Sequence, residues 1–175
     1  MVSWTVYTNY LFFQETEIGT VGIAECSGRI TNLYFGASAL SLDAEPGKTE
    51  VIGEAFMQLN RYFRGELKEF SLPLAPAGTP FMQHVWQILS KIPYGTTTSY
   101  KEIAIASGNP AAVRAVGMAN RRNPLPLFIP CHRVIGSDGS LTGYSGGLAL
   151  KKKLLELEEG RSVWNGNPRT KVNVV

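Results

Sequence analysis

Cysteine and histidine are both scarce in this chain of 175 residues, which holds two of each. Cys26 and Cys131 stand far apart, and neither belongs to a CxxC motif. A disulfide framework or a structural zinc site needs more such residues at short spacings. The scarcity therefore excludes both, and we expect two reduced thiols, no metal ion and no cofactor.

A long hydrophobic segment is also absent. No run of about 18 apolar residues could span a membrane, and the first residues, MVSWTVYTNYLFF, lack the basic region and cleavage site of a secretory signal. Hydrophobic residues form 44% of the chain and charged residues 18%, which is ordinary for a soluble globular protein. We expect one domain or two small ones, no membrane contact, and a cytosolic location, or a nuclear one in a cell with a nucleus.

Charge is unevenly distributed along the chain. Residues 1–80 carry five Lys and Arg against nine Asp and Glu, a net −4, whereas residues 81–160 carry nine against five, a net +4. This asymmetry indicates that the second half faces a polyanion. A solvated basic face that binds nothing would have the same composition, so the charge alone does not decide.

The first part of the chain has the pattern of a small α/β domain. Two β-rich runs flank Ser27-Gly28 in TVGIAECSGRITNLYFG, which predicts a hairpin. The next segment, KTEVIGEAFMQLNRYFRGE, predicts a helix that stops at Gly65. Its apolar residues recur at helical spacing, at Val51, Ala55, Leu59 and Tyr62. The prolines of SLPLAPAGTP then follow without periodicity, so we place a domain at residues 1–72 and a linker at 73–80.

The second part, residues 81–160, is predicted to be mostly helical. The segment PFMQHVWQILSKIP predicts a helix that begins at Pro80. Its expected apolar face is Phe81, Val85, Ile88 and Leu89. The segment TSYKEIAIASGNPAAVRAVGMANRRNP predicts two helices joined by a tight Gly-Asn-Pro turn, the second ending before Pro124. It is a helix-turn-helix candidate.

The second helix of this pair combines small residues with arginines. Its candidate DNA-contacting residues are Ala112, Arg114, Ala115, Gly117, Arg121 and Arg122. Small side chains let a helix backbone approach another surface closely, and arginine binds phosphate. The alternative is an alanine-rich helix packed against its neighbour, and spacing leaves both open.

The segment LALKKKLLELEEG predicts a last helix capped by Gly160. Its leucines cover a broad arc that also contains Lys151 and Glu158, while Glu156 faces the other way. A carboxylate on an apolar face is costly unless it is hydrogen-bonded. Glu158 therefore has a buried partner, or it reaches water from the helix end. Residues 161–175 show no clear period and are expected to form a flexible tail.

Cys131 and His132 are neighbours in PLPLFIPCHRVIG. A lone cysteine after an apolar run is commonly a small buried hydrophobe. On an extended strand the two side chains would point to opposite faces, but a bridging water or a turned backbone would let His132 take the thiol proton. Glu158 could orient the imidazole, and such a chain of groups would raise the thiolate fraction. This set suits a thiol hydrolase, whereas the basic helix-turn-helix suits chemistry on DNA.

Four blocks together resemble one family. IPCHRVIG, GTTTSYKEIA, RAVGMANRRNP and GYSGGLALKKKLLELEEG, in this arrangement, are similar to the O6-alkylguanine-DNA alkyltransferases. The resemblance implies an α+β fold, with a small RNase H-like α/β domain followed by a mostly helical domain with a helix-turn-helix. It implies a monomer that binds duplex DNA containing O6-alkylguanine, and also O4-alkylthymine. The alkyl group would pass irreversibly to Cys131, once per molecule, after base flipping.

The resemblance also implies roles in the chemistry. His132 would be a water-mediated base with Glu158 as its partner, and Tyr100 would donate a hydrogen bond to the departing guanine. Lys151 would support the pocket beside Tyr100. Asn123 would connect the second helix of the helix-turn-helix to the active-site strand. The residues expected to contact substrate are Asn123, Val134, Tyr144 and Ser145.

On the DNA side, the resemblance implies that Arg114 enters the base stack where the nucleotide leaves it. The small residues around Arg114 would meet the minor groove, unlike a usual helix-turn-helix, which reads the major groove. Met118 stands where relatives commonly have a small residue. Of the remaining candidates, Cys26 is expected in the core, and His84 is expected either at the surface or as a hydrogen-bonded histidine.

Two rivals remain beside transfer. A damage sensor of the alkyltransferase-like kind binds lesions without transfer, but such proteins have tryptophan where this chain has Cys131. A thiol hydrolase would use the same three side chains and release product repeatedly.

Overall fold

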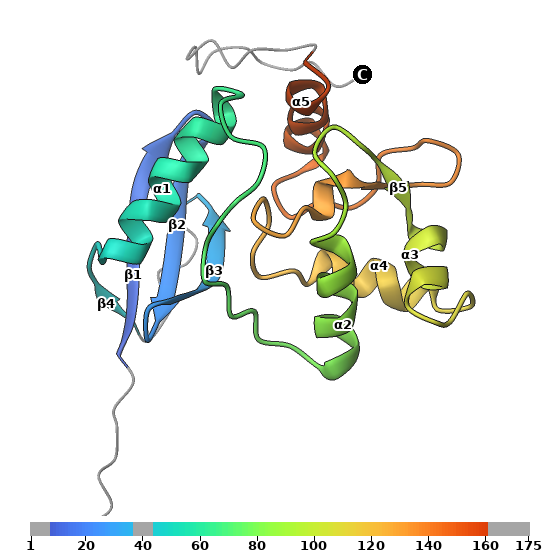
Figure 1. The fold of residues 1–175 in the computed structure, drawn as a ribbon, viewed down its shortest axis with the longest axis horizontal. Helices are drawn as coiled ribbons and strands as arrows, with labels where there is room; N and C mark the ends of the chain where they lie inside the picture. Colours follow the sequence, from blue (N-terminus) through green and yellow to red (C-terminus); the bar gives the residue numbers. More distant parts are fainter. Residues whose placement is uncertain (1–7, 37–43, 161–175) are drawn as a thin grey trace, which may run out of the picture.

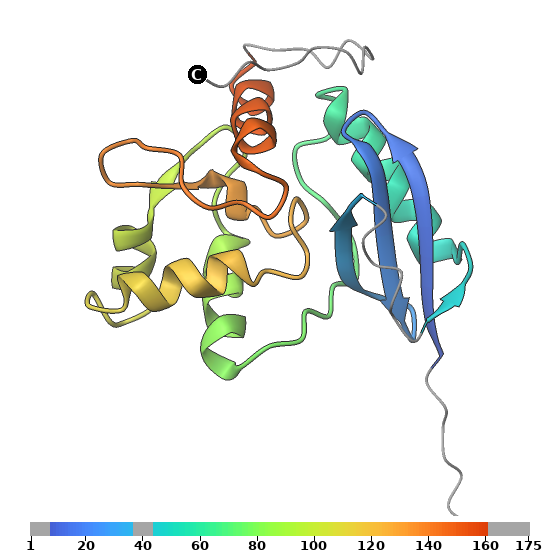
Figure 2. The ribbon, with the colours of Figure 1, turned by 180° about the vertical axis from the view of Figure 1, so that it is seen from behind.

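The computed structural model describes residues 8–36 and 44–160 (Figure 1). A sheet with one helix on its face lies beside a second part made mainly of helices. Figure 2 shows the same arrangement from behind, with the sheet in front of its helix. The α+β class is therefore confirmed. The tail expected at residues 161–175 lies outside the described residues.

The sheet has the strand order β3-β2-β1-β4. Its strands are β1 (Asn9–Thr16), β2 (Gly19–Cys26), β3 (Arg29–Phe35) and β4 (Glu45–Pro46). The first three are antiparallel, and β4 runs parallel to β1. The turn between β2 and β3 has positive φ at both Ser27 (53°) and Gly28 (75°). Two such residues give the turn the twist of the strands it joins, and the predicted hairpin is confirmed.

Helix α1 (Glu50–Phe63) covers one face of this sheet (Figure 1). Thr49 caps its first turn by accepting a hydrogen bond from the Ile52 backbone N–H, and the chain leaves it through Gly65 with φ at 73°. Its buried face is Ile52, Ala55, Phe56, Gln58, Leu59, Tyr62 and Phe63. The helical spacing therefore predicted the core correctly, except that Val51 is only partly buried.

The expectation that Cys26 belongs to the core is wrong. It is the last residue of β2, directly before the hairpin turn, and its side chain is half-buried. Val21, Ile23 and Ala24 of the same strand are buried. Cys26 stands at the end of the strand beside the turn, so residue type alone did not decide its burial.

The predicted linker, residues 73–80, is bound to the sheet. The Ile30 N–H donates to the Pro73 carbonyl at 2.8 Å, and the Ala75 N–H donates to the Ile30 carbonyl at 2.8 Å. Arg29 Nη2 also donates to the Leu74 carbonyl at 2.9 Å. The segment therefore runs along β3 as a hydrogen-bonded connector. The division into two domains around it stays a prediction.

Beyond the connector the chain is mostly helical. The elements are α2 (Pro80–Leu89), β5 (Thr98–Ser99), α3 (Tyr100–Ala106), α4 (Val113–Arg121), a 3-10 turn η1 (Cys131–Arg133), β6 (Val134–Ile135) and α5 (Leu148–Glu158). Thr79 caps α2 with Pro80 in its first turn, and a Ser99–Glu102 capping box begins α3. Strands β5 and β6 pair in parallel. They bring the start of α3 beside the residues that follow Cys131.

Two helix faces differ from the sequence prediction. In α2 the buried residues are Val85, Trp86 and Leu89, whereas Phe81 is 37% exposed. Trp86 is held inward because its indole N–H donates to the Ala119 carbonyl of α4 at 2.9 Å. In α5 the leucine at position 148 is 43% exposed. First-turn residues of both helices extend past the packed core, which periodicity does not reveal.

None of the helices in the described part of the chain is long and apolar enough to cross a membrane. Residues 8–36 and 44–160 also contain no cluster of three or more His, Cys, Asp or Glu side chains that could hold a metal ion.

Candidate active site

Cys131 lies on a tight turn. Pro130 precedes the single 3-10 turn η1, in which the Arg133 N–H donates to the Pro130 carbonyl at 3.0 Å. Of the two backbones considered for Cys131 and His132, the structure has the turned one and not the extended one. Pro130 restricts the backbone that leads into the turn. The turn, and not a strand, then sets the directions of the Cys131 and His132 side chains.

Asn123 anchors this turn from the end of α4. Its side-chain N–H donates to the Ile129 carbonyl at 2.9 Å, and its oxygen accepts from the Leu125 N–H at 3.0 Å. Both bonds are buried, so they fix the chain that leads into Cys131. The Cys131 side chain itself is almost inaccessible, with 2% exposure.

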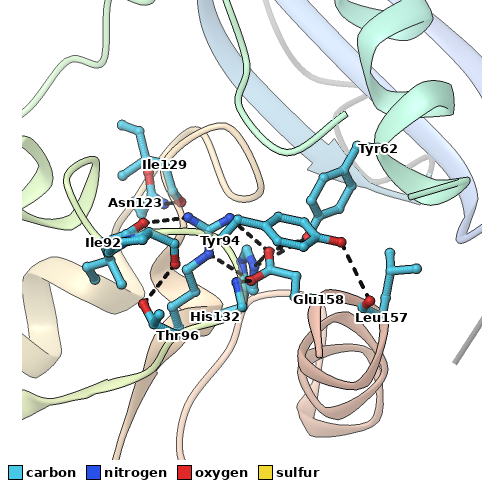
Figure 3. A network of polar contacts seen from close by, with 12 residues as sticks. Tyr62, Ile92, Tyr94, Thr96, Asn123, Ile129, His132, Leu157 and Glu158 are labelled. Carbon is cyan, nitrogen blue, oxygen red and sulfur yellow. Dashed lines mark hydrogen bonds and ion pairs between the residues drawn. The ribbon is translucent and has the colours of Figure 1, made fainter. Parts of the chain in front are cut away.

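His132 and Glu158 form a buried pair. His132 Nε2 lies 2.9 Å from Glu158 Oε1, and neither side chain is more than 1% exposed. The sequence left two alternatives for Glu158 on the apolar arc of α5: a buried partner, or a side chain that reaches water. The structure shows the buried partner, which is His132. Figure 3 shows the pair between α5 and the turn, with Tyr62 approaching from α1.

Arg133 binds the same carboxylate through two bonds. Its Nε donates to Glu158 Oε2 at 2.9 Å and its Nη2 to Oε1 at 2.9 Å, while Nη1 donates to the Ile92 carbonyl at 2.6 Å. Burial raises the pKa of Glu158, but hydrogen bonds from His132 and Arg133 and their charges outweigh it and bring that pKa to about 2. Glu158 is thus ionised throughout the working pH range.

Burial shifts the pKa values of the two reacting groups, His132 and Cys131, in opposite directions. It lowers the pKa of His132 below the ordinary 6.5, although the bond to Glu158 opposes this. It raises the pKa of the Cys131 thiol to about 11, against the effects of Asn123 and Lys151. The expectation of an enlarged thiolate fraction is therefore wrong for the protein without DNA. Its thiol is protonated and its imidazole neutral, which is the correct pairing for a proton transfer during reaction.

Three buried polar atoms among the described residues lack a hydrogen-bond partner: Asn120 Oδ1, His132 Nδ1 and Tyr144 OH. All belong to residues around Cys131. The Asn120 amide donates to the Cys131 carbonyl at 3.4 Å, and the Tyr144 ring packs edge-on against His132. Unpaired buried polar groups are costly, so their concentration here indicates a site built to receive a polar ligand or water.

Lys151 and Tyr100 contact each other and share the Thr142 carbonyl as a hydrogen-bond acceptor. Lys151 is fully buried and donates to the Val134 carbonyl at 2.6 Å and to the Thr142 carbonyl at 2.8 Å. Its ammonium lies 5.9 Å from the centre of the Tyr100 ring, and the Tyr100 hydroxyl donates to the Thr142 carbonyl at 3.3 Å. Burial lowers the pKa of Lys151 to about 8. Lys151 thus ties β6 to the loop before α5.

Helix α4 carries the candidate DNA-contacting residues. Val116, Ala119 and Asn120 are buried, but Arg114, Ala115, Arg121 and Arg122 are exposed. A Cβ added to Gly117 would meet nothing within 4 Å. Packing inside the protein therefore does not require these small residues, and the alternative of an alanine-rich packing helix explains only Ala119.

Comparison with known proteins agrees with this arrangement. Residues 4–76 match the model "6-O-methylguanine DNA methyltransferase, ribonuclease-like domain", and residues 80–160 match the corresponding "DNA binding domain". The chain belongs to the 6-O-methylguanine DNA methyltransferase family. A constitutive methylated-DNA–protein-cysteine methyltransferase of Bacillus subtilis is 49% identical over 157 residues, covering 86% of this chain and 95% of that protein.

Solved structures of relatives have the same fold. The crystal structure of Mycobacterium tuberculosis OGT in complex with DNA matches with a TM-score of 0.82 and 44% identity, over 88% of this chain and 95% of that one. The O6-methylguanine-DNA methyltransferase of Pyrococcus kodakaraensis matches with a TM-score of 0.64 and 28% identity, over 85% and 98%.

Within this methyltransferase fold, the predicted chemistry residues fall into one region. Cys131, His132, Glu158, Asn123 and Lys151 are buried together. Tyr100, Val134 and Tyr144 join them through the contacts of Lys151 and His132. Ser145 is exposed on the loop before α5. Ala112, just before α4, is half-buried, and His84 is exposed as expected.

Sequence reasoning missed three residues of the site. Arg133 was visible in the motif beside His132, but its bonds to Glu158 depend on the 3-10 turn. Asn120 is in the same motif as Asn123, and only the packing of α4 shows that it contacts the Cys131 carbonyl. Tyr62 was assigned to the apolar face of α1, and no local signal indicated that its hydroxyl reaches Glu158.

Proposed function

We propose that Cys131 takes the alkyl group from O6-alkylguanine, or from O4-alkylthymine, in duplex DNA onto its own sulfur. The observation that carries this is a buried thiol beside a buried His132–Glu158 pair, in a chain of the methylated-DNA–protein-cysteine methyltransferase family. The protein is a DNA repair methyltransferase, and DNA is its partner. One chain acts on one lesion, as a monomer.

The transfer needs help with the proton. With the pKa of Cys131 at about 11, only about one thiol in ten thousand is ionised at pH 7. His132 accepts the thiol proton, through a water at Nδ1, while Glu158 stabilises the imidazolium through Nε2. Sulfur then bonds to the alkyl carbon as the carbon–oxygen bond breaks, and the electron pair leaves with guanine. Tyr100 donates a hydrogen bond to that departing anion.

The product is a thioether, which has no leaving group for a second reaction. Cys26 is in the sheet part of the chain, at the end of β2, and Cys131 is the only other cysteine. No neighbouring thiol therefore regenerates the sulfur, and each molecule reacts once.

For DNA binding we propose that α4 enters the minor groove with its exposed small residues, while Arg114 fills the space left by the flipped base. Arg121 and Arg122 contact phosphates, so affinity falls with salt. The flipped base is contacted by residues of β6 and of the loop before α5, namely Val134, Tyr144 and Ser145.

Intact mass spectrometry after incubation with an O6-methylguanine duplex tests the transfer. We expect a gain of one methyl group per chain in the wild type and none in Cys131→Ala. The matched control is Cys26→Ala, which removes the other thiol and is expected to react like the wild type. Tight lesion binding with no adduct would favour the sensor, and repeated product release would favour a hydrolase.

Gly117→Ala is expected to separate stability from DNA binding. Because the added Cβ meets open space, helix propensity predicts a gain of about 1 kcal/mol in the free energy of unfolding. The same methyl group would stand between α4 and the groove, and we expect affinity for the lesion duplex to fall about tenfold. Thermal unfolding and fluorescence anisotropy measure the two effects.

Gly53→Ala is the control for this prediction. Gly53 lies within α1, where an added Cβ meets only Lys48 Cε at 3.8 Å. Its substitution is expected to give a similar gain in stability with unchanged DNA affinity. Equal affinity of the Gly117 variant and the wild type would contradict the minor-groove assignment of that face.

A further inference from the structure

Tyr62 connects the sheet-bearing part of the protein to the reacting groups. It is in the last turn of α1 and is fully buried. Its ring centre lies 5.2 Å from that of Phe70, 5.6 Å from Phe63 and 6.0 Å from Tyr94. In Figures 1 and 2, α5 lies beside the end of α1 that carries Tyr62. The aromatic cluster fixes the ring and therefore the direction of its hydroxyl.

The hydroxyl points to the His132–Glu158 pair (Figure 3). It donates to Glu158 Oε1 at 2.6 Å and lies 3.4 Å from His132 Nε2. Burial, followed by the charge of Glu158, raises the pKa of Tyr62 well above 10. The phenol therefore stays protonated and remains a donor at every pH at which the protein works.

We propose that Tyr62 is a positioning residue that sets the base strength of His132 through Glu158, so that the sheet-bearing part of the protein takes part in the transfer chemistry. The inference rests on the proposed role of His132 as the base. It assigns to α1 a function beyond packing against the sheet.

The carboxylate geometry gives the physical reason. Glu158 Oε1 accepts from Tyr62, His132 and Arg133, and Oε2 accepts from Arg133 and from the Gly95 N–H at 3.1 Å. Donors that share one oxygen share its charge. The Tyr62 bond therefore weakens the pull of Oε1 on the imidazolium, and it helps to keep His132 neutral until the thiol proton arrives.

Other ionisable groups also influence His132. Those that face it or act on its charge are Cys131 and Arg133 of η1, Tyr144 of the following loop, and Lys151 and Glu158 of α5. Removing the Tyr62 hydroxyl leaves all five in place. A change in the titration of His132 in such a variant thus reports the hydroxyl itself.

The test measures the single-turnover rate of alkyl transfer against pH for the wild type and Tyr62→Phe, which keeps the ring in its aromatic cluster. We expect the low-pH fall in rate to move about one pH unit upward, because a hydrogen bond to a charged group contributes about one pKa unit. The plateau rate, which is reached once His132 is neutral, is expected to change by less than tenfold. Thermal unfolding and lesion binding confirm that the variant is folded.

Tyr94→Phe is the matched control. Tyr94 stands edge-on to Tyr62, but its hydroxyl donates to the Leu157 carbonyl at 3.5 Å and makes no bond to Glu158. This variant is expected to keep the wild-type pH profile. If the pH profiles of Tyr62→Phe and Tyr94→Phe coincide, the inference is overturned. Loss of a hydroxyl that only supports packing would leave the pH profile unchanged in both variants.

A double variant separates this inference from the proposed base. In Glu158→Gln, the addition of Tyr62→Phe is expected to cause no further shift, because the charge through which it acts is gone. If Glu158→Gln and His132→Ala both react at the wild-type rate, the proposed base itself is wrong. If those two are slow and Tyr62→Phe has the wild-type profile, only the role of Tyr62 is wrong.

Discussion

Glu158→Gln is expected to lower the free energy of unfolding at pH 7 by about 3–5 kcal/mol. The substitution removes the negative charge and leaves Arg133 charged, with its side chain only 8% exposed. An unpaired buried charge has a cost of this size. Denaturant unfolding measures it.

Glu156→Gln is the matched control, two residues away on the same helix. Its carboxylate is 40% exposed and lies 3.9 Å from Lys152 Nζ. A surface pair of this kind contributes less than about 1 kcal/mol. If the two glutamine variants are equally stable, the bonds of Glu158 to His132 and Arg133 do not contribute the expected free energy of unfolding.

The same carboxylate predicts an acid dependence of stability. The pKa of Glu158 is about 2 in the folded protein and 4.5 as its ordinary value. A depressed folded pKa contributes stability above the unfolded value, and this is lost as the pH falls through the folded one. The wild type is therefore expected to lose about 3 kcal/mol between pH 4.5 and 2. A loss of the same size in Glu158→Gln would assign the acid dependence to other groups.

A buried partner for Glu158 was one of two alternatives that helical periodicity left open, and the resemblance to the alkyltransferases implied that this partner is His132. Lys151 and Glu158 shared the leucine arc of α5, and both are buried. Periodicity does not show what covers that arc. Arg133 and Tyr62 reach Glu158 from a turn and from α1, over sequence separations of 25 and 96 residues, and only the packed structure brings them there.

The backbone at Cys131 was only partly predictable. The sequence left an extended and a turned backbone open there, and it did not indicate that the turn would be a single 3-10 turn held by Asn123. The raised pKa of the thiol follows from the same packing. A local sequence pattern identifies the nucleophile, whereas its protonation state depends on burial by distant segments.

His132→Ala is expected to slow transfer by about 10²–10⁴-fold at neutral pH, the usual contribution of a positioned base. Burial lowers the pKa of His132 below 6.5, so the wild-type rate is expected to be level above neutral pH. Without the imidazole, the thiol must ionise to solvent with its pKa at about 11. The rate of the variant is then expected to rise about tenfold per pH unit up to that value.

The difference in slope is the informative measurement, because loss of stability alone would lower the rate without changing its pH dependence. His84→Ala is the matched control, since it removes the other histidine, which is exposed on α2. It is expected to keep the level profile of the wild type. A level profile in His132→Ala would mean that another group accepts the Cys131 proton. Convergence of the two rates near pH 11 would instead assign the whole effect of His132 to that single proton.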